Sequence, residues 1–118
     1  MPAPSRDRID YDGRVFRSAN PSAADATRGE LIGHYHQEGE LVWAEFGGGR
    51  VAQGRLVGVC RPDGTMDFAY CQVLVDGEIV AGRCLSTPVW RDDGTIALQE
   101  HYRRMDSGVS GVSWIEEM

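Results

Sequence analysis

Short runs rich in Val, Ile, Leu, Phe, Tyr and Trp alternate with turn signals along most of the chain. The clearest turn signals are Asp63-Gly64, Asp76-Gly77 and Asp93-Gly94. Asp-Gly between apolar runs favours a β-hairpin, because a type I′ turn needs positive φ at both central residues. No segment has the period of an amphipathic helix. The pattern therefore predicts an all-β protein.

The runs between these turns predict about eight strands. They span residues 14–18, 31–37, 41–46, 51–60, 65–74, 79–88 with an extension to 90, 95–103 and 112–117. Tight turns join all but the first pair, which gives an antiparallel up-and-down meander. A flat meander would leave two exposed edges, so we expect a small calycin- or lipocalin-like barrel or half-barrel.

The length of 118 residues fits one domain. Residues 1–10 are polar and contain two prolines, which predicts a flexible N-terminal tail ahead of a single β-barrel domain at 11–118. The first residues show no apolar segment of the kind found in signal peptides, and we expect a cytoplasmic protein. The net charge of −6 disfavours nucleic acid and anionic membranes as partners.

Two-residue Asp-Gly turns would place Val59 opposite Phe68 and Tyr70 opposite Arg83, and this register predicts which face of each strand points inward. The predicted inner face carries large side chains: Trp43, Val57, Phe68, Tyr70, Leu74, Ile79, Leu85, Ile96, Leu98 and Tyr102. The opposite face is smaller and more polar, but it retains an apolar patch of Val42, Phe46, Leu56 and Val80.

Several polar residues share the predicted inner face with this core. A water-filled lumen that fixes a small polar or amphipathic ligand would explain them. The candidate ligand-binding residues are Trp43, Glu45, Arg55, Tyr70, Arg83, Glu100 and Tyr102. The arginines would hold an anionic group and the aromatic rings an apolar part. The alternative is a structural hydrogen-bond network, or a concave face that is simply wet.

A second candidate site is His34-x-His36-x-x-x-Glu40, followed by Gly47, which matches the first metal motif of the cupin family. This resemblance implies that His34, His36 and Glu40 bind a divalent transition metal. The second cupin motif is missing, since Pro88 is followed by Val89 and Trp90. The alternative is that the histidines are hydrogen-bonded residues at the mouth of the barrel.

Other enzyme signatures are missing from the chain. There is no G-x-S-x-G elbow, phosphate-binding loop or Rossmann fingerprint. Cys60, Cys71 and Cys84 are widely spaced and odd in number, which favours reduced, unreactive thiols. We therefore predict a non-catalytic binding protein without a cofactor, with an enzyme that uses a divalent transition metal as the alternative.

The run HYHQEGELVWAEFGGGRVAQGRLVG, with RPDGTMDFAY, GRCLSTP and SWIEEM, resembles a family of small bacterial proteins that often carry the label N-acetylglutamate synthase. The resemblance covers residues 11–118 and supports the fold. The label implies acetyltransferase chemistry, yet the chain contains no acetyl-CoA loop of the form Q/R-x-x-G-x-G/A. The family therefore supplies no catalytic residues.

Three functions follow from these patterns. The first is a non-catalytic binding module for a small ligand in the lumen. The second is a cupin-like metal-dependent enzyme that uses His34, His36 and Glu40. The third is a protein–protein or self-association module, such as a homodimer, formed through the outer apolar patch of Val42, Phe46, Leu56 and Val80.

Overall fold

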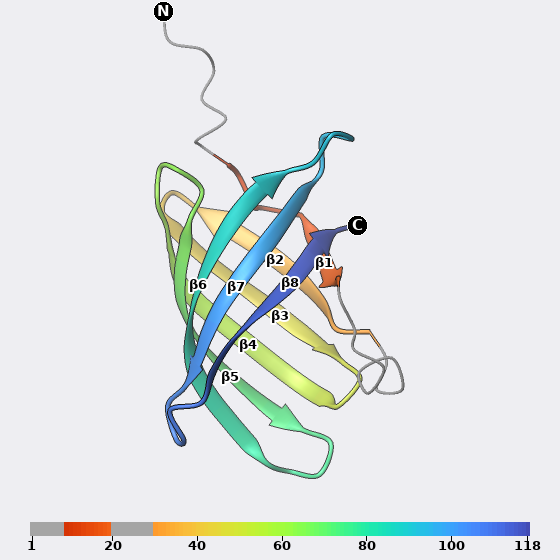
Figure 1. Ribbon diagram of the computed structural model, residues 1–118, viewed down its shortest axis with the longest axis vertical. Coiled ribbons are helices and arrows are strands. Elements are labelled where there is room, and N and C mark those ends of the chain that lie inside the picture. Colours follow the sequence, from red (N-terminus) through yellow and green to blue (C-terminus); the bar gives the residue numbers. More distant parts are fainter. Residues whose placement is uncertain (1–8, 20–29) are drawn as a thin grey trace, which may run out of the picture.

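The computed structural model describes residues 9–19 and 30–118 as a closed antiparallel barrel. Its strands are β1 (Val15–Ser18), β2 (Ile32–Glu38), β3 (Leu41–Gly48), β4 (Val51–Cys60), β5 (Met66–Leu74), β6 (Ile79–Trp90), β7 (Ile96–Arg104) and β8 (Ser110–Glu117). Each strand pairs with the next, and β1 also pairs with β8, which closes the sheet (Figure 1). The predicted all-β meander is confirmed, and the described part contains no helix long and apolar enough to cross a bilayer.

The Asp-Gly turns differ from the prediction by one residue. A type I′ turn would need positive φ at both Asp63 and Gly64. Gly64 has a φ of +86°, but only glycines have positive φ in the described chain, so Asp63 does not have the type I′ conformation. Gly64 N donates to Arg61 O at 2.9 Å, and Arg61 N donates to Thr65 O at 2.8 Å. This is a three-residue loop, a type I turn closed by a glycine bulge. The same hydrogen bonds recur around Gly77 and Gly94.

This difference changes which side chains point inward. Phe68 lies opposite Gly58 instead of Val59, and Tyr70 lies opposite Gly82 instead of Arg83. A shift of one residue moves every side chain of a strand to the other face. The predicted inner faces of β5 and β7 are therefore correct, and those predicted for β3, β4 and β6 are wrong.

On β3, β4 and β6 the interior is thus built from residues that the prediction had placed outside. Val42, Leu56 and Val80 are buried. Val57, which follows Leu56 and points to the opposite face of β4, is 55% exposed. The buried core consists of Ile9, Tyr11, Phe16, Tyr35, Val42, Ala44, Leu56, Cys60, Met66, Phe68, Cys84, Ile96, Leu98 and Ile115.

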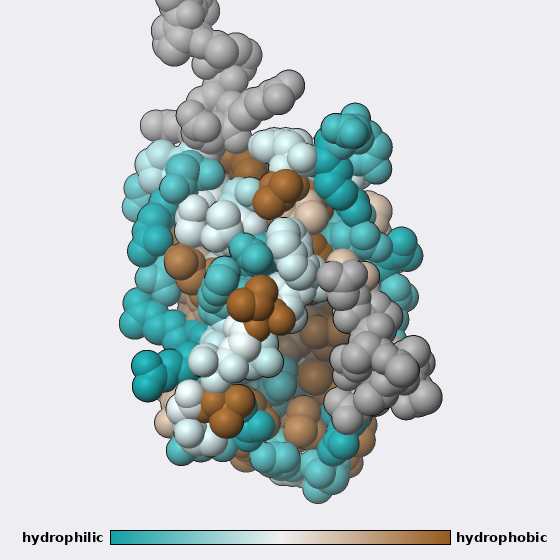
Figure 2. All heavy atoms as spheres, viewed as in Figure 1, coloured by the Kyte–Doolittle hydropathy of each residue, from teal (hydrophilic) through white to brown (hydrophobic). Residues whose placement is uncertain are grey.

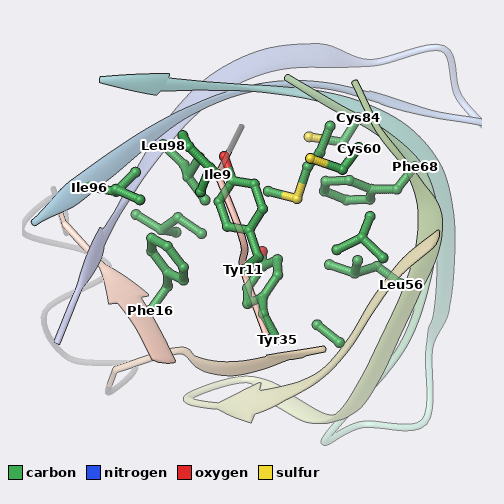
Figure 3. Close-up of a cluster of buried hydrophobic side chains, with 14 residues drawn as sticks. Ile9, Tyr11, Phe16, Tyr35, Leu56, Cys60, Phe68, Cys84, Ile96 and Leu98 are labelled. Carbon is green, nitrogen blue, oxygen red and sulfur yellow. The ribbon is translucent and has the colours of Figure 1, made fainter. Parts of the chain in front are cut away.

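One end of the barrel is filled by the segment that precedes β1. Tyr11 is fully buried, its hydroxyl donates to Gly64 O at 2.7 Å, and its backbone N–H donates to Gln37 Oε1 at 2.8 Å. Its ring lies 6.2 Å from Phe16 and 6.3 Å from Tyr35, in the middle of the barrel (Figure 3). Tyr11 therefore closes this end of the lumen.

The predicted tail of residues 1–10 lies mostly outside the described residues, which begin at Ile9. Ile9 itself is buried in the core together with Tyr11. Ile9, near the end of the predicted tail, thus contributes to the barrel interior.

Candidate functional site

The half of the lumen away from Tyr11 contains a cavity of about 490 Å³. Its walls come from Phe16, Leu31, Gly33, Tyr35, Phe46, Leu56, Phe68, Tyr70, Gln72, Val80, Cys84, Glu100, Tyr102, Arg104, Val109, Ser113 and Ile115. Figure 2 shows apolar atoms in a recess of the lower half of the molecule, bordered by polar residues. The volume is in the range of pockets that hold small organic ligands.

Glycines in the strands leave room for this cavity. Tyr70 on β5 lies opposite Gly82 on β6, and Tyr102 on β7 lies opposite Gly111 on β8. A Cβ atom at Gly111 would lie 2.5 Å from the Tyr102 hydroxyl oxygen, and one at Gly82 would contact Tyr70 in the same way. Each ring therefore lies along the wall, over the backbone of the next strand. Phe46 and Gly54 form a third pair of this kind, because the Phe46 ring occupies the space that a Cβ atom at Gly54 would take.

Glu100 on β7 is the acidic group of the cavity. Its Oε2 accepts a hydrogen bond from Ser86 Oγ at 3.3 Å, and Cys84 Sγ lies 4.0 Å from the same oxygen. Burial raises the pKa of the Glu100 carboxyl from 4.5 to about 7, and the hydrogen bond from Ser86 partly opposes this increase. Glu100 therefore exchanges a proton near neutral pH.

The neighbours of Glu100 stay neutral. Burial raises the pKa of the Tyr35 hydroxyl well above its ordinary value, and the nearby Glu100 carboxylate adds to the increase. The same two causes raise the pKa of the Cys84 thiol. A thiol held in its protonated form is a weak nucleophile, so Cys84 is not activated for covalent chemistry and lines the cavity as a neutral group beside Tyr35 and Glu100.

Arg104 is the last residue of β7 and lies at the open end of the cavity. Its guanidinium group donates to Glu78 Oε2 at 3.2 Å and to Asp106 Oδ2 at 3.0 Å. The two acidic side chains hold Arg104 at the rim.

Three of the seven predicted ligand-binding residues line the cavity. These are Tyr70, Glu100 and Tyr102. Their role in binding stays a prediction.

The other four predicted residues face outward, so their placement on the inner face is wrong. Arg83 is 70% exposed in its side chain and forms a two-pronged ion pair with Asp67, both at 3.0 Å. Arg55 Nη1 donates to the carbonyl oxygen of Gly54 at 2.8 Å. Glu45 and Trp43 lie on the outer face of β3.

The histidines of the predicted metal motif also lie on the outer face. His36 Nε2 is 2.8 Å from Glu45 Oε1, and its ring stacks on Trp43 with the centroids 5.5 Å apart. His34 is exposed one pair further along β2, and Glu40 is an exposed residue of the following turn. Across residues 9–19 and 30–118, no three His, Cys, Asp or Glu side chains come together as metal ligands.

The predicted outer apolar patch is wrong as a surface. Val42, Leu56 and Val80 are buried, and Phe46 lines the cavity. The outer face of β3 and β4 instead exposes Leu41, Val57 and Val59.

Two cavity residues were missed because of the turn register. Tyr35 and Cys84 line the cavity but were not among the predicted ligand-binding residues, because the assumed two-residue loops would turn their side chains outward. Pro62 carried a signal against that assumption: it fits the second position of a type I turn, and it has no N–H for a hydrogen-bonded strand pair.

Comparison with known proteins gives one family. The model of the family described as avidin-like protein matches residues 9–118, and searches of curated proteins and of solved structures found no match. The avidin-like family is a non-enzymatic ligand-binding fold. The resemblance to proteins labelled N-acetylglutamate synthase is wrong, since the matching family is a β-barrel family and nothing points to that label. With its closed eight-stranded barrel and a family match across nearly the whole chain, this protein belongs to the avidin-like family.

Proposed function

We propose that the protein is a non-catalytic binding module that holds a small amphipathic ligand in the open half of the barrel. The observation that carries the proposal is the cavity of about 490 Å³ inside a barrel whose other end is closed by Tyr11. A cavity with one closed end surrounds most of a small ligand and excludes water from it.

The lining matches an amphipathic ligand. Aromatic and aliphatic side chains such as Phe46, Phe68 and Val80 supply apolar area. Glu100 and Tyr35 supply polar groups at the inner end of the cavity. Membership of a family that binds small ligands such as biotin supports the same function.

The chemistry of the wall supports binding without catalysis. Cys84 is the one thiol that lines the cavity in the described chain, and burial keeps it protonated by raising its pKa. Both histidines of β2 lie outside the barrel, so neither can act as a general base on a ligand in the lumen.

A neutral fluorescent probe tests the proposal. N-phenyl-1-naphthylamine, which becomes bright in apolar surroundings, should bind the wild-type protein with a saturable increase in emission. Val80→Phe fills the buried wall of the cavity and should abolish this signal. Val73→Phe makes the same change at a 40% exposed position and should leave it intact.

Arg83→Ala adds a second control, because Arg83 points into solvent and should not affect the probe. Equal signals from wild type and Val80→Phe, with Val80→Phe folded by circular dichroism, would refute binding in the lumen.

We also infer that the protein forms a homodimer through the outer face of β3 and β4. Leu41, Val57 and Val59 are 48%, 55% and 47% exposed, and Leu41 is the direct cross-strand partner of Val59. Contiguous exposed apolar side chains favour an interface. Sedimentation equilibrium should show a dimer for wild type and a monomer for Val57→Asp, and a monomeric wild type would contradict the inference.

A further inference from the structure

Among the described residues, Glu100 is an acidic group without a cationic partner. Its carboxylate accepts a hydrogen bond from Ser86 Oγ at 3.3 Å. No arginine or histidine of the described chain lies within ion-pair distance of this carboxylate. The protein contains no lysine. Among the described residues, Arg104 is the one arginine on the cavity wall, and it is paired with Glu78 and Asp106 at the rim.

A carboxylate enclosed by protein is costly in its charged form unless a positive group pairs with it. The titratable groups around it cannot supply that charge. Tyr35 on β2, Tyr70 on β5 and Cys84 on β6 all have a pKa raised by burial and remain neutral, and Tyr102 on β7 is a further phenol. Among the described residues nothing supplies this positive charge, so a cation that enters the cavity would be the partner of ionised Glu100.

The walls next to Glu100 suit such a molecule. The rings of Tyr70 and Tyr102 lie along the barrel wall over Gly82 and Gly111, so their faces are turned to the lumen. The face of an aromatic ring carries partial negative charge and attracts cations. It also packs against flat apolar groups.

We propose that the lumen selects an organic cation, in which a flat apolar body packs between the tyrosines and an ammonium or amidinium group pairs with the carboxylate of Glu100. This selectivity rests on the proposed function of the cavity. A neutral ligand would leave Glu100 without a charged partner, and an anionic ligand would be repelled by it.

The pairing makes binding depend on pH. A cation favours ionised Glu100, so its affinity should rise as the pH increases through about 7, where the carboxyl loses its proton. A neutral ligand that accepts a hydrogen bond from the protonated carboxyl would show the opposite trend.

Three probes of one shape test the charge preference. They are 2-naphthylmethylammonium, 2-naphthylmethanol and 2-naphthoate, each titrated by calorimetry at pH 5.5 and pH 8. The proteins are wild type, Glu100→Gln and the control Glu45→Gln, which removes an exposed carboxylate from the outer face of β3.

Wild type and Glu45→Gln should bind the ammonium about tenfold or more tightly than the alcohol at pH 8, the effect of one charge-assisted hydrogen bond. The preference should shrink at pH 5.5. Glu100→Gln should bind the alcohol as wild type does, without preference for the ammonium at either pH.

Other outcomes would overturn the proposal. An equal or stronger affinity of wild type for the alcohol or the naphthoate would refute selection of a cation while leaving the lumen a binding site. A preference for the ammonium that survives Glu100→Gln would refute the role of Glu100. Binding of none of the three probes would overturn both this inference and the proposed function.

Discussion

Replacing Glu100 by glutamine should change how the stability of the protein depends on pH. Burial raises the pKa of this carboxyl from 4.5 to about 7 in the folded protein. The folded state therefore holds the proton more tightly than the unfolded state. The stability that this proton provides is fully present below pH 4.5 and is lost as the pH rises through about 7.

The size of the loss follows from the two values. Each pKa unit corresponds to about 1.4 kcal/mol, so the ionised form of Glu100 costs the folded protein about 3 kcal/mol relative to its protonated form. Glutamine is nearly the same size and is neutral at every pH. It can still accept the hydrogen bond from Ser86, so most of the packing should be kept.

The assay is urea denaturation of wild type and Glu100→Gln at pH 4.5 and at pH 8, followed by tryptophan fluorescence. Other titrating groups, such as Asp67 with its lowered pKa, affect both proteins equally and cancel in the difference. Relative to wild type, Glu100→Gln should become more stable by about 3 kcal/mol between pH 4.5 and pH 8. If the difference in unfolding free energy between Glu100→Gln and wild type is the same at pH 4.5 and pH 8 within about 0.5 kcal/mol, the carboxyl of Glu100 is not desolvated and the reasoning is refuted.

Three further predictions concern the walls and the closed end. Gly111→Ala should lower the unfolding free energy by about 1–3 kcal/mol and abolish probe binding, because the new Cβ displaces the Tyr102 ring into the cavity. Unchanged binding of the probe would contradict the packing of this ring on the glycine. Tyr11→Phe should lower the unfolding free energy by about 1–2 kcal/mol, because it leaves the buried Gly64 carbonyl without its donor, and an unaltered urea midpoint would be inconsistent with this hydrogen bond. A colorimetric thiol reagent should label Cys71 quickly and the buried Cys60 and Cys84 only after unfolding. Rapid release of three equivalents from the native protein would contradict the burial of these two thiols.

The sequence by itself determined the secondary structure and the class of fold. Strands such as β4 (Val51–Cys60) begin and end where the apolar runs meet turn residues. This works because turn chemistry and β propensity act over a few neighbouring residues, which a single sequence displays directly. The prediction of a barrel follows from the need of a long meander to pair its edges.

Only the tertiary structure decided which face of each strand points inward. Whether Asp76-Gly77 makes a loop of two or three residues is a small local difference, yet it moves Arg83 from the predicted pocket to the surface. The same difference brings Cys84 next to Glu100. Burial of one complete face of the closed sheet selects the loop length, and that free energy depends on all eight strands together.

The cavity likewise depends on contacts between distant parts of the chain. Tyr11 fills one end of the lumen by reaching Gly64, which lies 53 residues away, and the ring of Tyr102 clears the other end only because Gly111 lies opposite it on the next strand. The sequence places Glu100 on an inward-facing strand position, but its raised pKa requires the surrounding walls to exclude water from it. Local sequence thus sets where the chain turns and extends, and closure of the barrel determines which side chains share the space inside.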